Sequence, residues 1–153
     1  MVKIIVSFIQ LSLILVAGLY QRVVGLKAKN PKLKVMLAIG GWSFGTSKFK
    51  EVAETRFSRQ TFIFSAIPFL REHNFDGLDV DWEYPKASDK ENFVAYIKEL
   101  REAFEFEHEE TGNPRLLLSA AVPVRHFAIN IFHMIHATFQ CVIQKYDKIL
   151  TKY

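Results

Sequence analysis

Residues 76–85 have the sequence DGLDVDWEYP, in which acidic and apolar side chains alternate. This alternation, with Gly77 at its start and Pro85 at its end, is typical of a β-strand, whose successive side chains point to opposite faces of a sheet. The strand is predicted to place three carboxyl groups on one face: Asp79, Asp81 and Glu83. The opposite face is predicted to be apolar: Leu78, Val80 and Trp82.

Carboxyl groups two residues apart on a strand lie about 7 Å from each other. In a buried sheet such close like charges are costly, so at least one carboxyl is expected to keep its proton. A protonated acid beside an ionised one suits general acid catalysis at neutral pH. A cation site is the alternative, since hard cations prefer carboxylates. The neighbouring Trp82 and Tyr84 favour a sugar substrate instead, because sugar rings stack on aromatic side chains.

Two further apolar runs indicate that this strand belongs to a parallel α/β sheet. Residues 33–39 (LKVMLAI) end at a Gly-Gly pair, and residues 116–122 (LLLSAAV) follow a Gly-Asn-Pro turn. Short apolar runs of this kind are typical of buried parallel strands. Helical spacing of apolar residues separates the three strands, which predicts right-handed crossovers.

The helices carry recognisable start signals. One is predicted after Ser58, with Pro68 expected to kink or shorten it. A second is predicted to open with a capping box formed by Ser88 and Glu91. Thr46 and Ser47 offer a cap for a shorter helix between the first strand and Ser58.

The 153 residues have the length of one ordinary domain, and half of them are hydrophobic, which excludes a disordered chain. The net charge of +4 is unevenly spread: residues 1–60 and 121–153 are basic, and residues 61–120 are acidic. Nucleic-acid-binding proteins more often gather basic residues with interleaved aromatic residues on one face. Here four lysines surround a proline and fit a solvated helix end and loop, so we do not expect nucleic-acid binding: Lys27, Lys29, Lys32 and Lys34. Cys141 is the single cysteine, which excludes an internal disulfide.

Both ends of the chain are apolar. Residues 1–17 have the pattern of a secretory signal peptide, with a buried strand or helix as the alternative. They are too short and too polar for a stable membrane span. Near the other end, His133 and His136 are spaced like a metal pair, but ordinary half-buried histidines are the favoured interpretation.

Two of these segments together resemble the hallmarks of family 18 glycoside hydrolases, the chitinases. Residues 75–83, FDGLDVDWE, resemble the active-site signature, and residues 37–45, LAIGGWSFG, are similar to a second hallmark on the preceding strand. The likeness is continuous over residues 18–124 and points to secreted animal chitinases of the insect and mammalian type. It implies a TIM (β/α)₈ barrel with the acids at the C-terminal end of strand four.

The resemblance implies hydrolysis of chitin, a β-1,4-linked polymer of N-acetylglucosamine, with retention of configuration and no cofactor or metal. Glu83 would protonate the glycosidic oxygen, Asp81 would hold and polarise the substrate acetamide, and Asp79 would share a proton with Asp81. The acetamide oxygen would attack the anomeric carbon, as in other substrate-assisted enzymes. Five residues match positions that line the sugar cleft: Gly40, Gly41, Trp42, Ser43 and Tyr84.

A complete barrel of this type needs on the order of 250 residues, and about three of its eight strands, numbers 3–5, are recognisable here. We therefore expect residues 18–124 to be a partial catalytic domain between residues 1–17 and a divergent apolar segment, 125–153. The expected function is chitin hydrolysis, impaired in a truncated chain, by a secreted protein whose partner is chitin or a chitooligosaccharide. A non-catalytic chitin-binding fragment and a membrane-associated piece are the alternatives.

Overall fold

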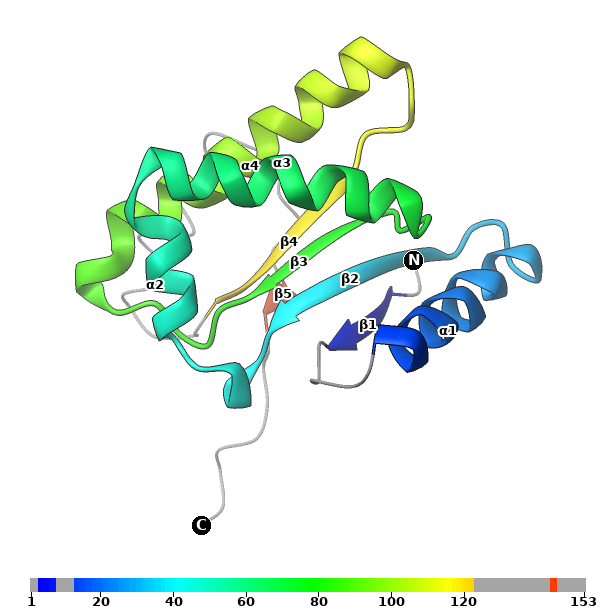
Figure 1. Ribbon diagram of the computed structural model, residues 1–153, viewed down its shortest axis with the longest axis horizontal. Helices are drawn as coiled ribbons and strands as arrows, with labels where there is room; N and C mark the ends of the chain where they lie inside the picture. The colour runs from blue at the N-terminus through cyan, green and yellow to red at the C-terminus, as the bar shows by residue number, and fades with distance from the viewer. Residues whose placement is uncertain (1–2, 8–12, 123–143, 146–153) are drawn as a thin grey trace.

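A computed structural model of the chain describes residues 3–7, 13–122 and 144–145, with side chains described for residues 18–121. Its strands form one sheet in the order β1-β2-β3-β4-β5, and every neighbouring pair is parallel (Figure 1). The strands are β1 Lys3–Ser7, β2 Lys34–Gly40, β3 Gly77–Asp81, β4 Leu117–Val122 and β5 Gln144–Lys145. Neighbours in the sheet are also consecutive in the chain, so the sheet is wound in one direction. A doubly wound sheet would reverse its strand order at a switch point.

Helices connect the strands and pack against one face of the sheet. They are α1 Leu13–Val24, η1 Gly25–Ala28, η2 Trp42–Phe44, α2 Ser47–Glu54, α3 Arg56–Glu72, η3 Ala87–Asp89 and α4 Lys90–Thr111. Figure 1 shows α3 and α4 lying over the central strands, with α2 close to the end of β2. No helix within the described ranges is long and apolar enough to cross a membrane.

The predicted parallel α/β organisation is confirmed. The three strands expected from the sequence are β2, β3 and β4, and they are adjacent in the sheet. The acidic strand is shorter than expected, because β3 ends at Asp81 and Glu83 follows in the loop.

The sequence of residues 1–17 predicts a signal peptide, with a buried strand or helix as the alternative. The structure bears on the alternative. Residues Lys3–Ser7 form β1, which pairs in parallel with β2 over the whole length of the strand. Leu13 begins α1, the connection between these two strands. A strand at the sheet edge therefore accounts for part of the segment, and the signal peptide stays a prediction.

Parts of the helix predictions are wrong. Pro68 does not shorten α3, which continues to Glu72, and the helix starts earlier than predicted, at Arg56. Its cap is Thr55, whose hydroxyl accepts a hydrogen bond from the Ser58 amide at 3.0 Å. α4 begins at Lys90, near the predicted point, but the predicted Ser-Glu capping box does not form.

The Asp89 side chain takes the place of that capping box. Its carboxylate accepts the Lys86 amide at 2.9 Å and pairs with Lys50 at 3.0 Å. These bonds tighten the chain into the short helix η3 before α4 begins. The start signal was therefore correctly located but assigned to the wrong side chain.

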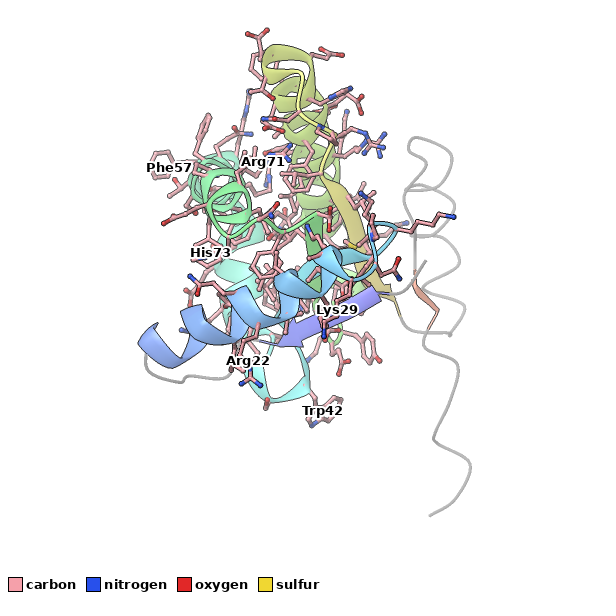
Figure 2. All side chains as sticks on the ribbon, turned by 90° about the vertical axis from the view of Figure 1, so that its right-hand side faces the viewer. Arg22, Lys29, Trp42, Phe57, Arg71 and His73 are labelled. Carbon is pink, nitrogen blue, oxygen red and sulfur yellow. The ribbon has the colours of Figure 1, made fainter. Side chains whose placement is uncertain are left out.

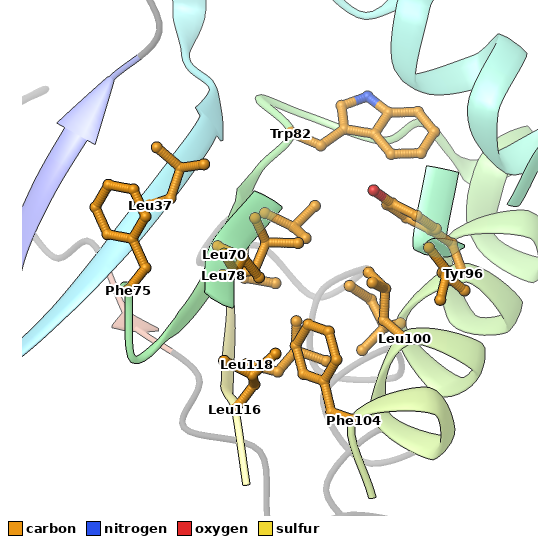
Figure 3. Packing of buried hydrophobic residues seen from close by; sticks show 14 of the residues in the cluster. Leu37, Leu70, Phe75, Leu78, Trp82, Tyr96, Leu100, Phe104, Leu116 and Leu118 are labelled. Atoms are coloured by element: carbon orange, nitrogen blue, oxygen red, sulfur yellow. The ribbon is translucent and has the colours of Figure 1, made fainter. Parts of the chain in front are cut away.

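The hydrophobic core lies between the sheet and the helices (Figure 3). α4 contributes five buried side chains to the helical side of this core: Phe93, Tyr96, Ile97, Leu100 and Phe104. The strands and the residue before β4 contribute alternate side chains: Val35, Leu37, Leu78, Val80, Leu116, Leu118 and Ala120. Each large apolar side chain buried in this way contributes about 1.5–3 kcal/mol, so the core is the main source of stability.

Candidate active site

The acidic strand lies at the centre of the sheet, between β2 and β4. In the register, Asp79 lies opposite Ala38 on one side and Ser119 on the other. Asp79 is only 3% exposed, and its carboxylate accepts a hydrogen bond from the Ser119 hydroxyl. Leu78 and Val80 belong to the core on the helical side, so the predicted division between an acidic and an apolar face is confirmed for β3. Asp79 is thus held on the sheet face that points away from the helices.

Ser119 was not singled out from the sequence as a site residue. The signal was present, because Ser119 is the one polar residue in the apolar run 116–122. Within a buried strand a hydroxyl needs a hydrogen-bond partner. Only the sheet order, which puts β4 beside β3, identifies that partner as Asp79.

The Gly-Gly pair brings β2 close to the end of the acidic strand. Gly40 lies opposite Asp81 in the register, and the Gly41 amide donates to the Asp81 carbonyl at 2.8 Å. A Cβ atom added at Gly40 would lie 2.2 Å from that carbonyl oxygen and 2.7 Å from the Phe49 ring. Gly40 also has a φ of +111°, a conformation that favours glycine. Gly40 is therefore required for the close approach of the two predicted motifs.

The loop that follows carries exposed aromatic side chains at the carboxyl edge of the sheet. Trp42 is 80% exposed, and Figure 2 shows it projecting away from the helices. Ser43 is exposed beside it, and Phe44 packs edge-on against Phe49. Parallel α/β sheets bind ligands at this edge. The structure thus brings Gly40, Gly41, Trp42 and Ser43 to the same edge as Asp81.

Trp82 corrects an expectation from the sequence. The sequence predicts Trp82 and Tyr84 as an aromatic surface for a sugar, but Trp82 is fully buried. Its ring stacks on Phe49 with centroids 5.3 Å apart and meets Phe93 edge-on at 5.8 Å. The physical reason is the strand alternation itself, which turns Trp82 toward the helices and away from the acids. Trp82 is a core residue between two acidic positions.

Tyr84 lies beside the two C-terminal acids. The pKa of its hydroxyl is raised, first by burial and then by the negative charges of Glu83 and Asp81. The phenol is 37% exposed and stays protonated at neutral pH, so it can donate a hydrogen bond. Glu83 and Asp81 are both half-buried. The edge of the sheet thus combines two carboxyl groups, a phenolic donor and, one loop away, an exposed indole.

The part of the chain that the structure describes contains no cluster of three or more His, Cys, Asp or Glu residues suited to holding a metal ion. His133 and His136 lie outside the described residues. The chemistry that the described side chains offer is proton donation and hydrogen bonding at a carboxyl-rich strand end.

Comparisons with known proteins identify relatives of this chain. The model for "Glycosyl hydrolases family 18" matches residues 2–150. Chitotriosidase-1 of Mus musculus is 54% identical over 110 residues, which cover 69% of this chain and 24% of that protein. A probable endochitinase of Caenorhabditis elegans is 52% identical over 106 residues, covering 69% of this chain and 17% of the other. The chain therefore spans a quarter or less of the length of these relatives.

A solved structure supports the same relationship. Human YKL-39, described as a pseudo-chitinase with retained chitooligosaccharide-binding properties, superimposes with a TM-score of 0.72 at 44% sequence identity. The match covers 81% of this chain and 34% of that protein.

Proposed function

The chain belongs to the glycosyl hydrolases of family 18, and we propose from that premise that the protein it represents hydrolyses chitin. The observation that carries the proposal is the acidic strand end, with Asp79 buried against Ser119 and Asp81 and Glu83 beside Tyr84. The substrate would be β-1,4-linked N-acetylglucosamine, bound along the carboxyl edge of the sheet. Secretion is proposed with it, because an extracellular polymer can be reached only outside the cell.

We further propose that this sheet is part of a TIM (β/α)₈ barrel. The one-directional strand order and the helices on one face are what such a barrel requires. Residues on the opposite face, among them Asp79, would then line the barrel interior. The remaining strands would come from the rest of a longer polypeptide, as in relatives that are four to six times the matched length.

In the proposed mechanism Glu83 donates its proton to the glycosidic oxygen as the bond to the leaving sugar breaks. The acetamide oxygen of the substrate forms the new bond to the anomeric carbon, so no enzyme carboxylate becomes covalently attached. Asp81 accepts a hydrogen bond from the acetamide N–H and stabilises the positive charge that develops on the acetamide. Asp79 shares a proton with Asp81. Water then attacks the same carbon with Glu83 as base, which retains the configuration.

The residues predicted to line the sugar cleft would bind the substrate. Trp42 would stack on the apolar face of a sugar ring, and Tyr84 would donate a hydrogen bond to the substrate. Gly40 and Gly41 would leave room for the sugar next to the acids. Because Ser43 is exposed in the same loop, its hydroxyl would contact a sugar hydroxyl.

Hydrolysis of chitotetraose by the chain and by Glu83→Gln tests the proposal. The substitution preserves shape but removes the proton donor, so we expect turnover to fall by about 10²–10⁴-fold with binding retained. Glu54→Gln, at the exposed end of α2, is the matched control and should leave turnover unchanged. Equal turnover by Glu83→Gln and the parent chain would contradict the assigned role.

A second candidate function is non-catalytic binding of chitooligosaccharides. It is favoured by the likeness to a pseudo-chitinase that retains such binding. The presence of Glu83 argues for hydrolysis, since lectin-like members of the family typically lack this acid. Binding of chitotetraose without turnover in either the parent chain or Glu83→Gln would establish the second candidate.

A further inference from the structure

The buried Trp82 indole N–H forms a hydrogen bond with a residue that is distant in the sequence. This N–H donates to the Thr46 hydroxyl at 2.5 Å, across 36 residues of sequence. Thr46 precedes α2 in the position where a threonine hydroxyl ordinarily caps the helix, yet here it makes no capping bond. Thr46 thus makes a long-range hydrogen bond in place of a stabilising helix cap. Such a departure from a local rule often marks a functional constraint.

Thr46 lies at one end of the loop that carries Trp42, and Gly41 lies at the other. The Gly41 amide donates to the Asp81 carbonyl at 2.8 Å, and Thr46 accepts from Trp82. The two ends of the loop are therefore tied to two consecutive residues of the acidic motif. Between these ties the loop is exposed, with positive φ at Gly41 and Gly45.

Packing holds Trp82 in place, so its hydrogen bond to Thr46 can fix the end of the loop. It is stacked on Phe49 of α2 and held edge-on by Phe93 of α4, with no exposed surface. An indole N–H buried this deeply needs an acceptor, because an unsatisfied buried donor costs about 1–3 kcal/mol. Thr46 supplies that acceptor. The position of Trp82 also constrains Glu83, the next residue in the chain.

We infer that Thr46 is a positioning residue that sets the loop of Trp42 relative to Asp81 and Glu83. Its hydroxyl holds the C-terminal end of the loop against the acidic motif, and the Gly41–Asp81 bond holds the other end. The functional consequence rests on the proposed function: the sugar-stacking indole and the acid keep a constant separation. Thr46 touches no reacting atom and acts only through Trp82.

Amide hydrogen exchange of the 153-residue chain tests this inference without any ligand. The Gly41 and Phe44 amides, which donate to Asp81 and Gly41 carbonyls, are the reporters, and α4 amides are the internal reference. Thr46→Val keeps the shape and removes the acceptor, so we expect the reporter amides to exchange about tenfold faster relative to α4. Thr46→Ser keeps the hydroxyl and should leave the reporters unchanged.

Trp82→Phe removes the donor and keeps an aromatic ring, so it should accelerate the same reporters. The double variant Thr46→Val with Trp82→Phe should be no faster than Trp82→Phe alone, since the bond is already absent. An additive double variant would overturn the inference, as would reporters that stay unchanged in Thr46→Val. Equal acceleration of loop and α4 amides would also overturn it, because that result indicates general destabilisation.

Chitotetraose titration, followed by the fluorescence of the exposed Trp42, connects the loop to binding. If the parent chain binds, Thr46→Val should bind more weakly and Thr46→Ser equally well; equal binding by all three would refute the functional consequence. If the parent chain does not bind, the proposed function fails for this chain, while the exchange measurements still decide whether Thr46 positions the loop.

Discussion

Replacement of Arg59 by Met is expected to destabilise the fold strongly. Arg59 is buried, and its guanidinium joins three helices. It donates to Glu99 of α4 at 2.7 and 3.0 Å and to the Ala53 carbonyl at the end of α2 at 2.8 Å. Met fills a similar volume with an apolar chain, so the substitution removes the charge and the donors while preserving most of the packing.

The expected loss of unfolding free energy depends on the Glu99 carboxylate, which stays in place without its partner. Removal of one partner from a buried ion pair costs about 3–5 kcal/mol, because the other charge stays uncompensated. The Glu99 side chain is 17% exposed, so water can partly replace the lost bonds, and we expect about 2–4 kcal/mol. Burial alone would raise the pKa of Glu99, but bonds from Arg59 and Gln60 hold it below its ordinary value. The loss is therefore expected to be largest above the pKa of an ordinary glutamate.

Urea unfolding followed by far-UV circular dichroism measures the effect. Lys98→Met is the matched control, since it removes an exposed α4 ion pair at 3.8 Å and should cost less than about 1 kcal/mol. Arg59→Met combined with Glu99→Gln should recover part of the loss, because no buried charge is then left unpaired. If Arg59→Met and Lys98→Met had equal unfolding free energies, the buried pair would not stabilise the helical layer as argued.

Three further predictions concern single side chains. Gly40→Ala should lower the unfolding free energy by about 2 kcal/mol or more, because its Cβ would lie 2.2 Å from the Asp81 carbonyl oxygen at a φ of +111°; an unchanged urea midpoint would refute this. Tyr96→Phe should raise the unfolding free energy by about 1 kcal/mol, since the buried Tyr96 hydroxyl has no hydrogen-bond partner among the described residues; a loss of stability would indicate such a partner. The Arg71 hydrogen bond lowers the pKa of Glu107, so this pair stabilises the fold above the unfolded-state pKa of about 4.3 and is lost as the pH falls through the folded-state value. Unfolding measured across acidic pH should therefore show a smaller acid-induced loss in Arg71→Met than in the parent chain.

Several features of the fold could be predicted from the sequence because they depend on local periodicity. The run of residues 33–39 predicted β2, and alternation around Asp79 predicted which face of β3 is acidic. The helix start signals were less reliable. Thr46 was assigned to a helix cap, and Ser88 to a capping box, because local rules do not include acceptors or donors that arrive from distant segments.

The sequence alone determined that Asp79, Asp81 and Glu83 belong to one motif at the end of a buried parallel strand, because side-chain alternation and apolar runs are local properties. Its resemblance to family 18 glycoside hydrolases also predicted the Gly-Gly turn as the second element of the candidate site. Only the tertiary structure decided the partners: Ser119 for Asp79, Thr46 for Trp82, and Gly41 for Asp81. These pairs are separated by about forty residues each, and they meet because β2, β3 and β4 lie side by side in parallel register, with the loop after β2 beside the end of β3.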